Sequence, residues 1–208
     1  MPVTLERIET AGPDRRARRL VFSDPFAEPR LTALAVVRAL GLEEGAEIDP
    51  AELAARLVSC ELSCARERAL RVLGHRDRSA HELDRRLKDD GYPSAARQVV
   101  LDRLGELGLI DDGRFADSWV RTRTAAGFGP QRIRKELRDK GVADETAAAA
   151  LGSFADADPV AQARRALGTT RIESRADRER ALRKLLRKGF DLGTALKAID
   201  DDGDPDAS

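Results

Sequence analysis

The stretch that decides the fold runs from residue 107 to residue 116 and reads Leu107-Gly108-Leu109-Ile110-Asp111-Asp112-Gly113-Arg114-Phe115-Ala116. Gly108 suits the left-handed conformation that closes a helix, and Leu109 and Ile110 would form an apolar plug after it. Asp111 or Asp112 can then accept a hydrogen bond from the free N–H groups at the start of the next helix. The stretch therefore predicts a joint between two helical units.

The segments on both sides of this joint form a repeat. Gly91, Gly141 and Gly189 lie 50 and 48 residues apart. A leucine lies four positions before each glycine, and an apolar residue follows it: Tyr92, Val142 and Phe190. This pattern is typical of a helix stop in which glycine is left-handed and the next side chain packs back. A period near fifty residues predicts repeat units that bury their apolar faces partly against their neighbours.

Each repeat is expected to contain three short helices. The helices are expected near 65–75, 79–90 and 94–107, then 112–125, 130–140 and 144–151, then 159–168, 175–188 and 192–200. The domain boundaries that follow are 1–62 for an N-terminal adaptor, 63–112, 113–158 and 159–200 for the repeats, and 201–208 for an acidic tail. The tail has no apolar residue to pack beyond one alanine, and we expect it to be disordered.

The N-terminal adaptor has a different pattern. Residues 3–8 alternate apolar and polar side chains, and residues 18–22 can return as a second strand after the turn Gly12-Pro13-Asp14. We therefore expect a small β-hairpin. Four arginines lie near its tip, Arg15, Arg16, Arg18 and Arg19. They are either solvated or bind phosphate, and the pattern favours solvation.

Two further helices are expected in the adaptor. The apolar residues between Pro29 and Leu42 fall at helical spacing, and Gly41 ends that helix. The second helix starts at Asp49-Pro50. The predicted fold class is mainly α, with three tandem three-helix repeats behind a small hairpin. The composition agrees, because only 4 % of the 208 residues are aromatic and 36 % are charged. Such a core must be built from Leu, Ala, Val and Ile, which suits thin helices. The sequence contains no signal peptide, transmembrane run or lipidation motif, so a soluble cytoplasmic protein is expected.

Charge is distributed unevenly, although 37 basic residues balance 37 acidic ones. Ten basic residues and three acidic residues lie between 161 and 190, and a second basic cluster lies on the helix expected at 130–140. A basic run on one helix is usually its solvated face. Repeated on equivalent helices, it predicts a basic stripe that could follow a phosphate backbone or an acidic protein groove. Its candidate residues are Arg132, Arg134, Lys135, Arg138, Lys140, Arg183, Lys184, Arg187 and Lys188.

Motifs for catalysis, metals and cofactors are absent from the sequence. Cys60 and Cys64 have no second pair of metal ligands, so two reduced thiols on one helix face are expected. The segment 127–130, Gly-Phe-Gly-Pro, follows no strand and matches no nucleotide-binding pattern. Phe115 and Trp119 share a helix face and are expected in the core rather than as a stacking platform. We expect neither an enzyme, a cofactor nor a metal site.

Several segments together carry a family resemblance. They are Asp77-Arg78-Ser79 with Glu82-Leu83 and Arg86-Leu87, the joint at 107–116, Gly127-Phe128-Gly129-Pro130 with Arg132-Ile133 and Glu136-Leu137, and Lys140-Gly141-Val142. In order and spacing the chain resembles the RecX family of recombinase regulators over about residues 64–200.

This resemblance implies an all-helical monomer that binds RecA-type recombinase filaments on DNA. It implies inhibition of ATP hydrolysis, strand exchange and coprotease activity, and so a role in regulating DNA repair and the SOS response. DNA itself would be bound weakly and without sequence preference. The alternative is a helix-turn-helix-like transcriptional regulator that binds double-stranded DNA with sequence specificity, because three-helix units of this size are compatible with that function. A third possibility is a scaffold repeat that binds another acidic protein.

Overall fold

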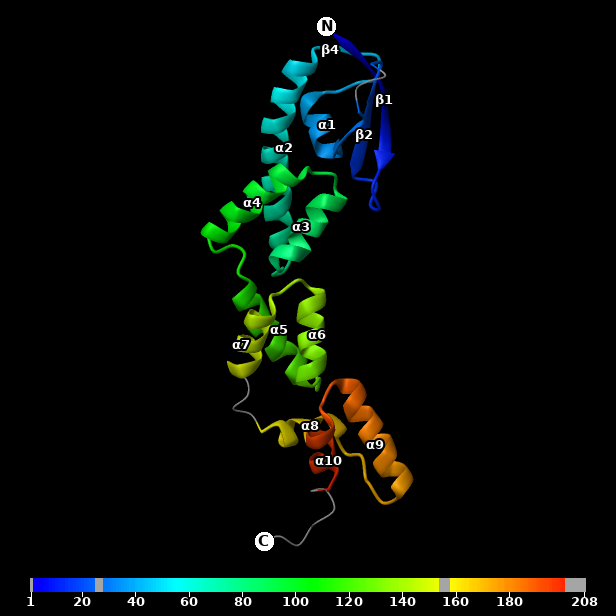
Figure 1. Ribbon diagram of the computed structural model, residues 1–208, viewed down its shortest axis with the longest axis vertical. Coiled ribbons are helices and arrows are strands. Elements are labelled where there is room, and N and C mark those ends of the chain that lie inside the picture. Colours follow the sequence, from blue (N-terminus) through cyan, green and yellow to red (C-terminus); the bar gives the residue numbers. More distant parts are fainter. Residues whose placement is uncertain (1, 25–27, 154–157, 201–208) are drawn as a thin grey trace. The chain divides into compact units, whose positions relative to one another are not determined.

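The computed structural model describes residues 2–24, 28–153 and 158–200 and divides the chain into two compact units, residues 1–111 and 112–208 (Figure 1). The division falls inside the joint at 107–116 that the sequence singled out. Both units are mainly helical, and the first also contains a small sheet. The fold class expected from the sequence, mainly α with three-helix units and an N-terminal β element, is confirmed.

The N-terminal sheet has four antiparallel strands in the order β3-β2-β1-β4. The expected hairpin is confirmed as β1 (Val3–Ala11) and β2 (Ala17–Phe22), and β3 (Arg30–Ala33) and β4 (Glu47–Ile48) pair along its two edges. Leu5 and Leu20 are fully buried and pack against Val37 of α1 (Leu34–Leu40). Helix α1 therefore covers one face of the sheet.

The helix expected from Pro29 to Leu42 is partly wrong. Residues 30–33 form β3, and the helix begins only at Leu34. The strand forms because Ala33 and Thr32 pair with Ala17 and Arg18 of β2, a partner that lies about fifteen residues away and that helical spacing does not reveal. The expected end of the helix is confirmed, because Gly41 has a φ of 61° and donates its N–H to the last turn.

Helix α2 (Pro50–Leu73) is longer than the sequence suggested. Its start is confirmed: the Asp49 carboxylate accepts hydrogen bonds from the N–H groups of Ala51 and Glu52, at 2.8 and 3.0 Å. The helix then runs without a break through the expected boundary between residues 62 and 63, so it belongs to the adaptor and to the first three-helix domain alike. Because both halves share one buried core, they fold as a single unit.

Helices α3 (Ala80–Asp89) and α4 (Ser94–Glu106) complete the first unit. Gly91 is left-handed, with a φ of 97°, and the N–H of Tyr92 donates to the carbonyl of Leu87 at 3.1 Å while its ring is buried. After α4, Gly108 has a φ of 66° and Ile110 is buried, as expected. Leu109 is exposed instead, so only Ile110 serves as the apolar plug.

The second unit contains six helices within its described residues. They are α5 (Asp112–Ala125), α6 (Pro130–Asp139), α7 (Asp144–Ser153), α8 (Pro159–Leu167), α9 (Arg175–Lys188) and α10 (Leu192–Asp200). Each lies within two residues of its expected bounds. The helix stops recur. Gly141 and Gly189 are left-handed, and the N–H of the residue after each donates to a carbonyl five residues earlier, Val142 to Leu137 and Phe190 to Leu185.

Two separate cores lie inside the second unit. Helices α5, α6 and α7 bury one that contains Phe115, Ile133 and Leu137, and helices α8, α9 and α10 bury another that contains Leu185 and Phe190. Phe115 is buried as expected, and Trp119 is partly buried and stacks on it, with ring centroids 6.0 Å apart. The acidic tail expected at 201–208 lies outside the described residues.

Candidate binding surface

The two most basic helices of the second unit, α6 and α9, meet end to start (Figure 1). The first N–H groups of α6 have no partner within their own helix. Here the N–H of Gly129 donates to the carbonyl of Lys188 at 2.8 Å, and the N–H of Gln131 donates to the carbonyl of Gly189 at 3.0 Å. The last carbonyls of α9 therefore satisfy the start of α6. This contact joins the two three-helix groups of the unit.

The close approach requires glycine on both sides. A Cβ atom added at Gly129 would lie 2.5 Å from the carbonyl carbon of Gly189, and one added at Gly189 would lie 2.5 Å from the backbone nitrogen of Arg132. Real Cβ atoms do not come so close to backbone. The segment Gly127-Phe128-Gly129-Pro130, which matches no nucleotide-binding pattern in the sequence, is thus the docking segment between the two groups.

Phe128, between these glycines, is surrounded by cations. The guanidinium carbon of Arg123 lies 3.9 Å from its ring centroid and that of Arg132 lies 4.5 Å away, while Lys188 Nζ lies at 5.8 Å. Cation–π contacts of this kind contribute about 0.5–2 kcal/mol each, depending on desolvation. They tie α5, α6 and α9 to one aromatic ring.

Glu136 balances this group of cations. Its carboxylate accepts two hydrogen bonds from Arg123, at 2.6 and 2.5 Å, one from Arg132 at 3.1 Å and one from Trp119 Nε1 at 3.2 Å. Burial by itself would raise the pKa of Glu136, but the hydrogen bonds and charge of the two arginines outweigh it, so the pKa is lowered. Lys140 lies over the Trp119 ring at 4.2 Å and completes the group.

The nine cations expected to form a stripe therefore fall into two groups. The inner cations take part in internal contacts: Arg132, Lys140, Lys184 and Lys188. Among them, Lys184 Nζ donates to the carbonyl of Leu167 at 2.9 Å, at the end of α8. The outer cations are exposed on α6 and α9: Arg134, Lys135, Arg138, Arg183 and Arg187. Of the outer cations, Arg138 pairs with Asp144 at 3.3 Å, whereas the other four have no ion pair among the described residues.

Two features of this surface escaped the sequence reasoning. Leu186 is 42 % exposed in the last turn of α9, where it lines a shallow hollow of about 600 Å³ with Arg180, Arg183 and Arg187. An apolar side chain off the buried stripe of the helix, beside Ala181 and Leu185, was the signal that could have found it. The other is Arg123, which contacts Phe128 and Glu136 but lies outside both basic clusters.

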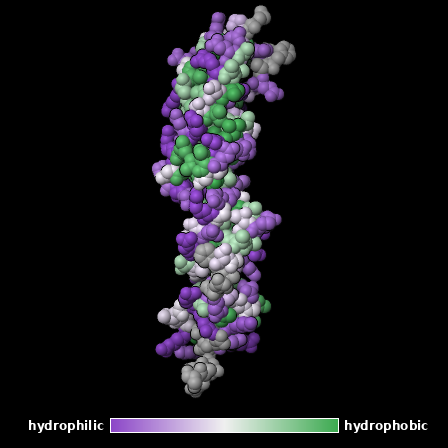
Figure 2. Space-filling view, turned by 90° about the vertical axis from the view of Figure 1, so that its left-hand side faces the viewer, coloured by the Kyte–Doolittle hydropathy of each residue, from purple (hydrophilic) through white to green (hydrophobic). Residues whose placement is uncertain are grey.

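Among residues 2–24, 28–153 and 158–200, no three His, Cys, Asp or Glu side chains gather where they could hold a metal ion. Cys60 and Cys64 are free thiols in the first unit, with their sulfur atoms 3.8 Å apart. No helix in the described part of the chain is both long and apolar enough to span a bilayer. Figure 2 shows that the largest hydrophobic areas on the face drawn lie on the first unit.

Comparison with known families places most of the helical chain. Residues 65–104 match the model of the first three-helix domain of RecX, and residues 111–151 match the model of its second three-helix domain. The matches include α3, α5 and α6, nearly all of α4 and α7, and residues 65–73 at the end of α2. The N-terminal sheet and helices α8 to α10 lie outside both.

Relatives and solved structures agree with these matches. The regulatory protein RecX of Mycolicibacterium smegmatis is 38% identical over 148 residues, which are 65% of this chain and 77% of the relative. That of Halorhodospira halophila is 41% identical, over 66% of this chain and 89% of the relative. A crystal structure of a regulatory protein RecX has a TM-score of 0.63 at 26% identity and covers 95% of this chain and 99% of its own. RecX from Lactobacillus salivarius, at 24% identity and a TM-score of 0.64 over 70% of this chain, shares the fold.

Proposed function

The chain belongs to the RecX family, and on that premise we propose that it regulates DNA recombination and repair by binding RecA-type recombinase filaments. Binding would inhibit ATP hydrolysis, strand exchange and coprotease activity, in the cytoplasm and as a monomer, without any chemistry of its own. The relatives are named regulatory proteins, which supports a role of this kind.

The observation that carries the proposal is the set of outer cations on two helices locked end to start. Arg134 and Lys135 on α6 and Arg183 and Arg187 on α9 are exposed and, among the described residues, have no ion pair. Arginine presents a planar fork that binds phosphates and carboxylates equally well, so a filament of acidic protein and DNA offers suitable partners. Because such contacts act through charge, they speed association and weaken as salt rises.

The experiment is a titration of DNA-dependent ATP hydrolysis by the cognate recombinase on single-stranded DNA. The wild-type chain is expected to inhibit at well below one molecule per recombinase, which favours a block to filament growth over coating. The variant R134S/K135S/R183S/R187S removes four outer cations and spares the inner ones. It should need about ten times more protein for the same inhibition, since four solvated charge contacts contribute roughly 1.5 kcal/mol or more together.

The matched control is R121S/R165S/R171S/R175S, which removes the same charge from exposed positions elsewhere in the second unit. It should inhibit like the wild type. Equal inhibition by both variants would contradict the role of the outer cations. If the folded wild-type chain inhibits nothing but binds bare double-stranded DNA with sequence preference, the transcriptional regulator is the better assignment.

A further inference from the structure

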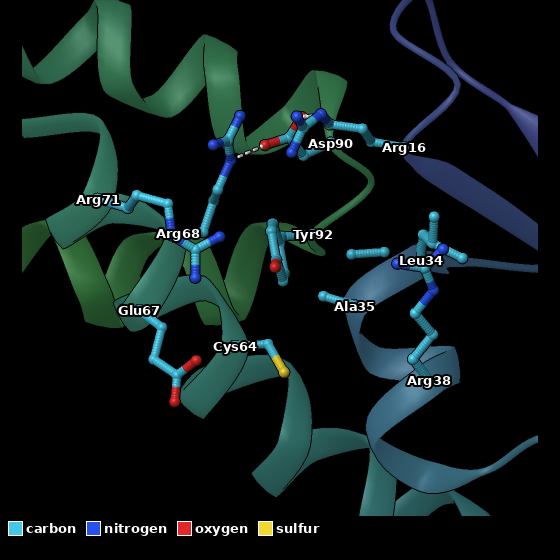
Figure 3. Close-up of a pocket in the computed structure, with 11 residues that line it drawn as sticks. Arg16, Leu34, Ala35, Arg38, Cys64, Glu67, Arg68, Arg71, Asp90 and Tyr92 are labelled. Atoms are coloured by element: carbon cyan, nitrogen blue, oxygen red, sulfur yellow. Dashed lines mark hydrogen bonds and ion pairs between the residues drawn. The ribbon is translucent and has the colours of Figure 1, made fainter. Parts of the chain in front are cut away.

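The first unit contains a pocket of about 370 Å³ whose lining residues all belong to that unit (Figure 3). The pocket lies between α1 and α2 and is closed by the start of β2 and by the end of α3. Four arginines line it: Arg16, Arg38, Arg68 and Arg71. Only two carboxylates, those of Glu67 and Asp90, line it as well. The lining is therefore positively charged.

Asp90 offsets one of the four positive charges. Its side chain is 3% exposed, and Oδ2 accepts a hydrogen bond from Arg68 Nε at 2.5 Å. Oδ1 is buried and accepts no hydrogen bond from any residue that the structure describes. Two guanidinium nitrogens lie within ion-pair distance of Oδ1, Nε of Arg86 at 3.8 Å and Nε of Arg16 at 4.0 Å. Three guanidiniums thus converge on a single carboxylate, although Arg86 also pairs with Asp14 of the hairpin.

Arg38 and Arg71 face the same opening from two helices. Figure 3 places Arg38 on α1 on one side and Arg71 on α2 on the other, with Tyr92 between them. Neither guanidinium has a hydrogen bond or an ion pair within residues 2–24, 28–153 and 158–200. Unpaired arginines at the mouth of a pocket are not explained by the fold, because the first unit is packed without them.

Apart from the carboxylate of Glu67, the rest of the lining adds no negative charge at neutral pH. Ala33, Leu34 and Ala35 form an apolar wall. Burial, together with the neighbouring Cys60 thiol, raises the pKa of the Cys64 thiol to about 11, and burial also raises the pKa of Tyr92. Both groups therefore remain neutral.

We infer that this pocket binds a phosphate-bearing anion, held by Arg16, Arg38 and Arg71. A carboxylate is planar and occupies one guanidinium fork, whereas a di- or polyphosphate presents oxygen atoms in several directions. Guanidiniums that approach from the hairpin residue before β2 and from α1 and α2 match the second geometry. The pocket has the volume of a small-ligand site. The phosphate comes either from a free nucleotide or from a nucleic-acid backbone.

This site is independent of the function proposed above, because it lies in the other compact unit and uses none of the outer cations. It also reassigns part of the hairpin tip. Of the four arginines that the sequence placed there, Arg16 lines the pocket, whereas Arg18 donates to the carbonyls of Arg15 and Ala17.

The test is calorimetric titration of inorganic pyrophosphate into the full chain, in chloride buffer at low ionic strength. The wild-type chain should show one saturable site. The variant R38S/R71S should bind at least about tenfold more weakly, because it removes two charge-assisted contacts. The matched control is R19S/R66S, which removes two exposed arginines from β2 and α2 outside the pocket. It should bind within about threefold of the wild type.

Three outcomes would overturn the proposal. They are the absence of saturable binding to the wild type, equal binding by R38S/R71S and the control, and loss of binding in R134S/K135S/R183S/R187S instead. Helical content from circular dichroism checks that each variant is folded.

A competition arm separates the two sources of phosphate. If a short oligothymidylate displaces pyrophosphate from the wild type, and R38S/R71S binds both weakly, the pocket recognises nucleic-acid backbone. If pyrophosphate stays bound at saturating oligothymidylate, the pocket takes a free phosphorylated ligand. Either result supports the phosphate site.

Discussion

Asp90 in the first unit and Glu136 in the second are both bound by arginines, but their oxygens differ in how many hydrogen bonds they accept. Asp90 is 3% exposed and is approached by three guanidiniums, yet one of its oxygens accepts no hydrogen bond from a described residue. Glu136 is 19% exposed, and its two oxygens accept four hydrogen bonds. The deeper carboxylate is the less satisfied one.

Arginines and a carboxylate therefore form a compact cluster around Glu136 but line a pocket beside Asp90. Around Glu136, charge and hydrogen bonds are matched, so the cluster closes on itself and fixes α6 against α5 and α9. Around Asp90 the positive charge exceeds the negative charge, and the excess faces a cavity. The net energy of a charged group depends on whether its partners are complete. The predictions that follow perturb each cluster in turn, beginning with the largest effect.

Gly189→Ala should disrupt the contact between the end of α9 and the start of α6. The residue has a φ of 91°, and a Cβ atom would lie 2.5 Å from the backbone nitrogen of Arg132. Strain and overlap together should lower the free energy of unfolding by about 3 kcal/mol. Trp119 is the single tryptophan and lies in the second unit, so its fluorescence during urea unfolding measures this change.

Gly41→Ala is the control, because Gly41 is also left-handed but has nothing within 4 Å of the added Cβ. Its effect should be about 1 kcal/mol, from backbone strain alone. An equal effect of both substitutions would mean that the α6–α9 contact is not tight.

Asp90→Asn should destabilise the first unit by about 2–3 kcal/mol, because it leaves the guanidinium of Arg68, whose side chain is only 14% exposed, without its counter-charge. The same change makes the pocket more positive. Added pyrophosphate should therefore restore more stability to the variant than to the wild type. Near-ultraviolet dichroism of Tyr92, the single tyrosine, measures unfolding of this unit. No extra rescue by pyrophosphate would argue against excess charge in the pocket.

Glu136→Gln should destabilise the second unit by roughly 2 kcal/mol at neutral pH, since hydrogen bonds to a charged acceptor are lost. The lowered pKa of Glu136 also gives the sign of the pH effect. Its charged form stabilises the fold above the ordinary value of 4.5, and this contribution is lost as pH falls through the lowered pKa of the folded state.

The stability difference between wild type and Glu136→Gln should therefore shrink below pH 4.5. Urea unfolding followed by Trp119 fluorescence at several pH values measures it. A difference that grows as the pH falls would contradict the assignment. Pyrophosphate should not rescue this variant, in contrast with Asp90→Asn.

Lys140→Met should have the smallest effect, a loss of about 0.5–1 kcal/mol. The substitution keeps the aliphatic part of the side chain and removes the cation over the Trp119 ring. The fluorescence of native Trp119 should change while helical content stays the same. A loss as large as that of Glu136→Gln would mean that Lys140 contributes as much as Glu136 to holding α5 and α6 together.

Local patterns were sufficient for the helices of the second unit. The leucine four residues before Gly141 and Gly189, and the apolar residue after each glycine, define a helix stop through contacts within one turn. Such contacts depend only on nearby residues. For the same reason the start of α2 at Asp49-Pro50 and the end of α1 at Gly41 followed from the sequence.

Distant partners explain what could not be predicted. Residues 30–33 became a strand because β2 lies beside them, and α2 passed the expected boundary because both of its halves pack into one core. The role of the Gly-Phe-Gly-Pro segment depends on the carbonyls at the end of α9, which accept hydrogen bonds from the N–H groups of Gly129 and Gln131. None of these partners lies within one helical turn.

The sequence by itself determined the helical repeat, its glycine stops, the N-terminal hairpin and the location of basic residues on α6 and α9, because periodicity and helix ends are properties of neighbouring residues. Which of those cations make contacts inside the fold and which are exposed is set by the three-dimensional arrangement, as is the convergence of Arg16, Arg68 and Arg86 on Asp90. A charged side chain has no fixed role in a sequence, since its role depends on the groups that folding brings within a few ångströms of it.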